Sequence, residues 1–98
     1  MKNELTETEA KVYEMIERFK ENNLYLDYLE FVDEVCWMIK CDFMLNTPKS
    51  ENELADRIIK SMKFIIDKNK GKNVLFFSQL EKEDLNMIGA LILGLIEG

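Results

Sequence analysis

The chain has 98 residues, of which 47% are hydrophobic and 33% charged, and its formal net charge is −6 at pH 7. This length and composition suit one folded domain, residues 1–98, with a single core, and exclude an intrinsically disordered chain. The negative charge disfavours binding of nucleic acid or an anionic membrane over the whole surface, because either would be repelled at long range.

The sequence also argues against a secreted or membrane protein. Residues 1–9 are polar and acidic, unlike the apolar stretch of a signal peptide. The most apolar run, residues 87–96, contains two glycines and is far shorter than the roughly 20 residues that span a bilayer. We therefore expect a cytoplasmic protein that binds no membrane and whose two cysteines are reduced.

The first predicted helix covers Thr6–Asn22. A capping box marks its start, with Thr6 as the N-cap and Glu9 as the acidic partner three residues later. An apolar stripe with helical spacing follows, formed by Val12, Met15, Ile16 and Phe19. The stripe predicts that this helix buries one face and leaves its acidic residues in solvent.

The second predicted helix, Tyr28–Leu45, is apolar on two opposite sides. A capping box of Asp27 and Glu30 predicts its start. The face expected to join the core consists of Tyr28, Leu29, Val32, Val35, Cys36, Ile39 and Phe43. The opposite face, expected to form an oligomer interface, contains Phe31, Trp37, Met38, Cys41 and Leu45. Such a helix is either enclosed by other helices of its own chain or covered by a second subunit.

The third predicted helix, Ser50–Lys68, follows the only proline of the chain. Two starts fit the sequence, because Thr47 with Pro48 at the first helical position and Ser50 with Glu53 are both acceptable caps. Its core-facing stripe consists of Leu54, Ala55, Ile58, Ile59, Met62, Ile65 and Ile66. The regular spacing of this stripe predicts one buried face.

A candidate partner-binding patch lies on the opposite side of the third helix. It consists of Arg57, Lys60, Phe64 and Lys68. An aromatic ring among cations can stack on a nucleic-acid base or anchor an acidic segment of a partner. The alternative interpretation is that Phe64 is covered by Phe76 and Phe77, by the first helix, or by a second subunit.

The run from Lys72 to Phe77 is open to two interpretations. Residues 74–77 have strand propensity and could form a hairpin, but we favour a buried connector because the preceding helical stripe is unbroken. The last predicted helix, Gln79–Ile96, starts after Ser78, although a later start near Glu83 would also suit the helix dipole.

Small residues interrupt this apolar last helix. Ala90 and Gly94 are four positions apart, so they lie on one face and would let another helix approach closely. Because Gly costs about 1 kcal/mol relative to Ala in a helix, the alternative is that the glycines simply fray the last two turns.

The sequence contains few of the residues and motifs that enzymes use for catalysis. The chain has no His, and it lacks a glycine-rich phosphate loop and a cluster of metal ligands. Cys36 and Cys41 are five residues apart, so on one helix they point in divergent directions and share neither a metal nor a disulfide. We therefore expect a protein without enzymatic activity, cofactor or metal.

The run Leu5-Thr6-Glu7-Thr8-Glu9-Ala10-Lys11-Val12-Tyr13 resembles the first helix of winged-helix transcriptional regulators. That family continues with two short helices joined by a tight turn, the second of which reads the major groove. Here Leu24–Leu45 contains no glycine or turn signal, so no DNA-contacting residue is carried over from the resemblance.

Together these patterns predict an all-α protein, a compact four-helix domain that associates through its second and last helices into a homo-oligomer, most simply a dimer. The predicted interface combines the residues named on the second helix with Ala90 and Gly94. The predicted function is that of a non-enzymatic interaction protein that docks to another macromolecule, and a protein is the favoured partner. The alternative is a nucleic-acid-binding regulator that uses the basic end of the third helix.

Overall fold

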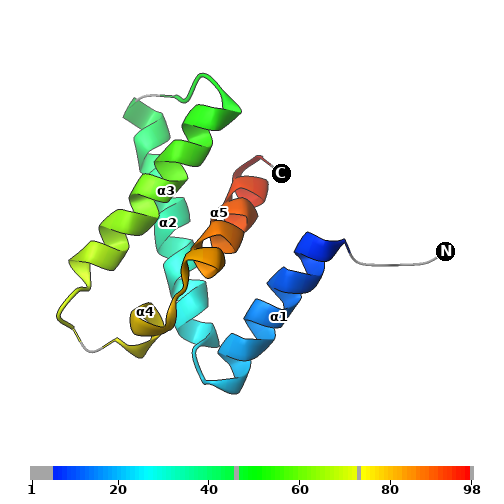
Figure 1. Ribbon diagram of the computed structural model, residues 1–98. Coiled ribbons are helices and arrows are strands. Elements are labelled where there is room, and N and C mark those ends of the chain that lie inside the picture. The colour runs from blue at the N-terminus through cyan, green and yellow to red at the C-terminus, as the bar shows by residue number, and fades with distance from the viewer. Residues whose placement is uncertain (1–5, 46, 73, 98) are drawn as a thin grey trace.

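The computed structural model describes residues 6–45, 47–72 and 74–97, except for the side chains of Phe43 and Leu45. Within these ranges the protein is all-α, with five helices and no strand (Figure 1). The helices are α1 (Glu7–Glu21), α2 (Tyr25–Leu45), α3 (Glu51–Lys68), α4 (Leu75–Gln79) and α5 (Lys82–Glu97). The predicted all-α class and the four long helices are confirmed, and α4 is an additional short helix. None of the described helices is long and apolar enough to cross a membrane.

Three of the helices, α2, α3 and α5, pack against one another, and α1 lies against α2 and α5 (Figure 1). The core between them is formed mainly by aliphatic side chains that are almost completely buried: Val35, Ile39, Ile58, Ile65, Ile88 and Ile92. Each of the three helices contributes two side chains to this set. Hydrophobic burial of this kind is the main source of stability in a small domain.

Aromatic side chains close one end of the bundle. Phe76 of α4 is completely buried. Its ring centroid lies 5.3 Å from the ring centroid of Phe19 and 5.7 Å from that of Phe31. The rings of Phe19 and Tyr28 add a contact at 5.4 Å between α1 and α2. Residues 75–79 thus form a helical turn that delivers Phe76 to the core, and the strand interpretation of this segment is wrong.

Helix boundaries follow side-chain caps where the caps satisfy backbone groups. The capping box of α1 is present, because Thr6 Oγ1 accepts from the backbone N–H of Glu9 at 3.1 Å and Glu9 Oε1 accepts from that of Thr6 at 3.0 Å. Of the two starts proposed for α3, Ser50 is the N-cap, accepting from the N–H of Glu53 at 3.1 Å. These two predictions are confirmed.

Two predicted starts are wrong. Helix α2 begins three residues early, at Tyr25, so Asp27 lies in its first turn instead of capping it. The reason is a tight connection, in which Asn23 adopts φ 60° and the N–H of Leu24 donates to the carbonyl of Phe19 at 2.7 Å. Helix α5 begins late, at Lys82, as the alternative had it, because the Asp84 carboxylate accepts the backbone N–H of Glu81 there. The Ser78 hydroxyl donates instead to the carbonyl of Leu75 within α4.

Candidate interaction surface

The outer face of α2 exposes several large apolar side chains. The exposed fractions are 73% for Leu26, 67% for Trp37 and 86% for Met44, while Leu29, expected in the core, is 42% exposed. At 100° per residue the first three lie within about 20° of one line along the helix. We call the following exposed residues the α2 outer face: Leu26, Leu29, Glu30, Asp33, Trp37, Lys40, Cys41 and Met44.

The predicted interface residues of α2 differ in their exposure to solvent. Trp37 and Cys41 are exposed, and Met38 is partly buried against the core. Phe31 is 2% exposed, because Phe76 and Phe77 of the same chain cover it, so its assignment to an interface with a second chain is corrected. The side chain of Leu45 lies outside the described part of the structure.

Three charged side chains are interspersed among the apolar residues of the α2 outer face. Glu30, Asp33 and Lys40 are exposed, and among the described residues no oppositely charged group lies within ion-pair distance of any of them. Many charges elsewhere are paired within the chain, for example Lys68 with Glu34 of α2. This face therefore combines unpaired charges with uncovered apolar area.

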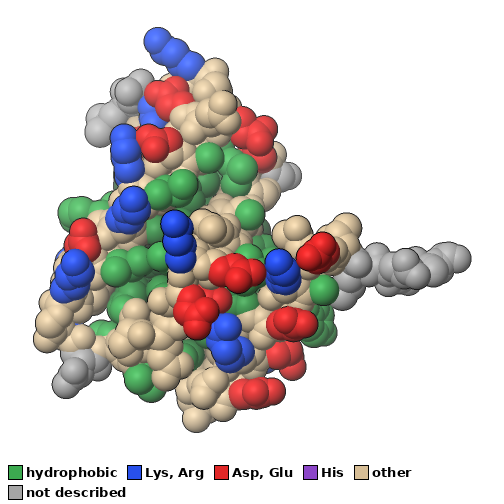
Figure 2. All heavy atoms as spheres, in the orientation of Figure 1, with side chains coloured by type: hydrophobic (Ala, Val, Ile, Leu, Met, Phe, Trp, Pro, Cys, Tyr) green, Lys and Arg blue, Asp and Glu red, His purple; other side chains and the backbone are tan. Residues whose placement is uncertain are grey.

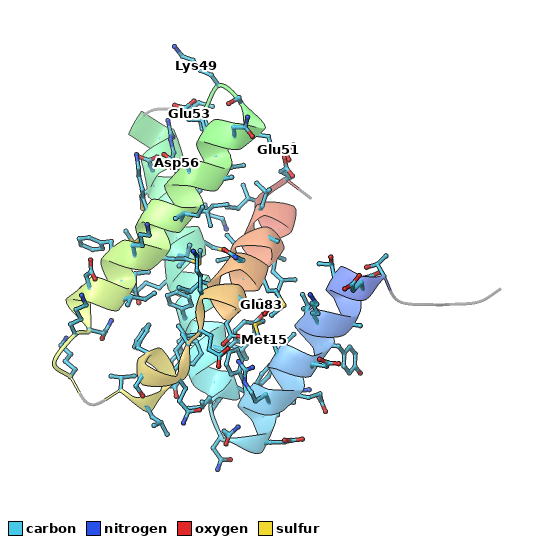
Figure 3. The ribbon with its side chains drawn as sticks, in the orientation of Figure 1. Met15, Lys49, Glu51, Glu53, Asp56 and Glu83 are labelled. Atoms are coloured by element: carbon cyan, nitrogen blue, oxygen red, sulfur yellow. The ribbon has the colours of Figure 1, made fainter. Side chains whose placement is uncertain are left out.

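The predicted cationic patch on α3 is largely neutralised. Arg57 pairs with Asp42 at 2.7 Å and with Glu53 at 3.3 Å. Lys60 pairs with Asp56 and Lys68 with Glu34, both at 3.0 Å. Three carboxylates, Glu51, Glu53 and Asp56, lie along the first two turns of this helix, and Glu53 accepts the backbone N–H of Lys49 at 2.5 Å (Figure 3). The three cations brought together by the sequence are therefore not free to bind a polyanion without losing these partners.

Phe64, at the centre of that patch, is 58% exposed. The rings of Phe76 and Phe77, one of the three covers considered for Phe64, are packed instead on Phe31. Sequence spacing placed Phe64 on the correct side of α3 but could not decide whether another element would cover it.

Two shallow grooves flank α5. One, of about 430 Å³, lies between α3 and α5, and the other, of similar volume, lies between α1 and α5; Ala90 lines both. Figure 2 shows hydrophobic side chains over α3 and α5 with charged side chains beside them. A Cβ added at Gly94 would meet nothing within 4 Å. Within the chain, therefore, no described element occupies the space in front of Gly94.

A polar junction joins α1 to the start of α5. Met15 of α1 and Glu83 of α5 lie close together there (Figure 3), and the buried carboxylate of Asp84 accepts a hydrogen bond from Arg18 at 2.6 Å. That hydrogen bond raises the pKa of the Arg18 guanidinium. No group of three or more His, Cys, Asp or Glu in the described ranges is arranged to hold a metal ion.

The remaining shifts in pKa have structural causes. Backbone N–H donors lower the pKa of Glu9 and of Glu53 at the starts of α1 and α3. Burial raises the pKa of the Cys36 thiol and of the Tyr28 hydroxyl. These groups lie at the starts of helices and in or beside the core.

No protein-family model, curated protein or solved structure matches the chain.

Proposed function

We propose that the protein is a small helical interaction protein without catalytic activity, which docks to other macromolecules and assembles with copies of itself. The observation that carries this proposal is the α2 outer face. Its apolar side chains extend about 27 Å along the helix axis, from Leu26 to Met44, given a rise of 1.5 Å per residue. Nothing in the described part of the chain covers them.

Exposure of these side chains is not a consequence of an incomplete core. Val35 and Ile39, on the inner side of the same helix, are 0% and 1% exposed, so α2 already has its intramolecular partners. Exposed tryptophan is especially informative, because Trp is among the residues most enriched at the energetic centres of protein interfaces. Several large apolar side chains exposed on one face of a small domain indicate an interaction site.

Absolute mass measured by light scattering tests the proposal. We expect the wild type to have at least twice the chain mass of 11.6 kDa, and Trp37→Glu to be monomeric with unchanged helix content. The matched control is Phe64→Glu, which places the same charge on an exposed aromatic position of α3 and should leave the mass unchanged. Monomeric wild type at concentrations of about 0.5 mM, where even weak association is visible, would reject self-assembly through this face.

The nucleic-acid alternative keeps one supporting observation, the exposed ring of Phe64 between Lys60 and Lys68. It predicts that a single-stranded oligonucleotide binds at low salt and that Lys60→Glu with Lys68→Glu abolishes the binding. Failure of the wild type to retain any oligonucleotide at low salt would reject it. The ion pairs of both lysines make this the weaker proposal.

A further inference from the structure

Six residues of the α2 outer face are regularly spaced along the helix, and no described part of the chain packs on them. They recur at alternating intervals of four and three, and all are exposed: Leu26, Glu30, Asp33, Trp37, Lys40 and Met44. Alternation of four and three residues is the spacing of a coiled-coil seam, in which the side chains of one helix pack against those of a second helix.

We propose that this seam pairs with the same seam of a second copy. The two α2 helices run antiparallel about a two-fold axis that crosses the seam at the level of Val35 along the helix. The inference rests on the self-assembly of the proposed function and specifies its geometry. In this register Leu26 faces Met44 of the second copy, Glu30 faces Lys40, and Asp33 faces Trp37. Two-fold symmetry repeats each pair, so the interface is formed by one surface used twice.

Charge complementarity selects this register. Glu30 and Lys40 lack an ion-pair partner among the described residues of their own chain, and the antiparallel register gives each one a partner of opposite charge. Apolar pairs of Leu26 and Met44 then close both ends of the seam. At its centre the indole N–H of Trp37, which can only donate, meets the Asp33 carboxylate, which can only accept when ionised.

Other arrangements of the same two helices lose these pairs. A parallel arrangement sets Glu30, Asp33 and Lys40 each against its own copy, so that like charges face one another. An antiparallel shift of seven residues in one direction places Glu30 against Asp33. A shift in the other direction places Asp33 against Met44 and leaves Glu30 beyond the overlap, so no pair of opposite charge remains.

A charge-swap experiment tests the register. Glu30→Lys and Lys40→Glu should each weaken dimerisation roughly tenfold or more, because each change replaces two symmetry-related attractions by repulsions. The double variant should return the dissociation constant to within about threefold of wild type, because it restores both pairs with their signs exchanged. Ten residues, about 15 Å of helix, separate the two positions in one chain, so the rescue reports a contact between chains.

Net charge offers a built-in control. The two single changes shift the net charge of the chain in opposite directions, so a general effect of repulsion would strengthen association in one variant and weaken it in the other. Glu14→Lys, at an exposed position of α1, makes the same change as Glu30→Lys away from the seam and should leave the dissociation constant unchanged.

A cross-linking measurement checks the direction of pairing. In a chain carrying Cys36→Ser and Cys41→Ser, a mixture of Leu26→Cys and Met44→Cys chains should form a disulfide-linked dimer, and either chain alone should not. Wild type that dimerises while the charge-swap double variant stays as weak as the singles would overturn the register but leave the proposed function standing. Wild type that stays monomeric would overturn both the register and the self-assembly in the proposed function.

Discussion

Arg18 of α1 donates a hydrogen bond from Nη2 to Oδ2 of Asp84, at 2.6 Å, across 66 positions of the chain. The same oxygen accepts the backbone N–H of Glu81 at 3.0 Å, so one carboxylate caps the start of α5 and anchors α1 to it. Asp84 is 2% exposed and is the one buried charged residue among those that the structure describes. This contact holds α1 against the start of α5.

Removal of this carboxylate should destabilise the fold. We expect Asp84→Ala to lower the free energy of unfolding by about 2–3 kcal/mol, because it removes a charge-assisted hydrogen bond and a cap at a buried position. Urea unfolding followed by circular dichroism measures the change. Lys70→Ala, which breaks the exposed pair with Asp67, is the control and should change stability by less than about 0.5 kcal/mol. Equal stability of the two variants would contradict the anchoring role of Asp84.

The two carboxylates at helix starts predict an acid dependence of stability. Backbone N–H donors hold the pKa of Glu9 and of Glu53 below their ordinary value of 4.5 in the folded state. Each group therefore contributes stability that is fully present above pH 4.5 and is lost as the pH falls through the lowered folded pKa. Unfolding free energies measured between pH 7 and pH 3 should fall less steeply for Glu9→Gln with Glu53→Gln than for wild type. Identical slopes would show that these caps do not titrate with folding.

The two helical glycines of α5 predict different responses to alanine. At Gly94 an added Cβ meets open space, so Gly94→Ala should raise the free energy of unfolding by about 0.5–1 kcal/mol through helix propensity alone. At Gly89 the Cβ would lie 3.2 Å from Cε of Met62, which must shift, and the gain should be smaller. Parallel thermal and urea unfolding of the two variants gives the comparison. A larger gain at Gly89 would contradict this account.

Cysteine labelling should separate the two thiols. Cys41 is exposed, whereas Cys36 is partly buried and burial raises its pKa, so less of its reactive thiolate form is present. We expect iodoacetamide at pH 8 to modify Cys41 roughly tenfold faster than Cys36 at low protein concentration. Mass spectrometry of Cys36→Ser and Cys41→Ser, labelled in parallel, gives each rate directly. Equal rates would mean that α2 opens locally on the timescale of labelling.

Local sequence signals predicted most of the fold. The capping residues of α1 and α3, Thr6 and Ser50, could be read directly because their hydrogen bonds link residues three apart. The early start of α2 could not, since it depends on the left-handed backbone of Asn23 and on burial of Leu24. Helix α4 was missed because a single turn is too short to show a period.

The candidate surface was predicted only in part. Helical periodicity identified a second apolar side of α2, and Trp37 and Cys41 are indeed exposed. It assigned Phe31 to the same side because spacing alone does not tell which neighbour, here Phe76, will cover a residue. The ion pairs of Arg57 with Asp42 and of Lys68 with Glu34 could not be predicted from the sequence either, because they join different helices.

The position of Trp37 determines what optical spectroscopy can report about this protein. It is the only tryptophan of the chain and is 67% exposed in the single chain. In the monomer its emission should therefore change little when the chain unfolds, since the indole passes from one aqueous environment to another. Burial of the same ring by a partner would shift the emission to shorter wavelength. Intrinsic fluorescence is thus a natural assay of docking on α2 and a poor one of folding, which tyrosine absorbance and helix circular dichroism report instead.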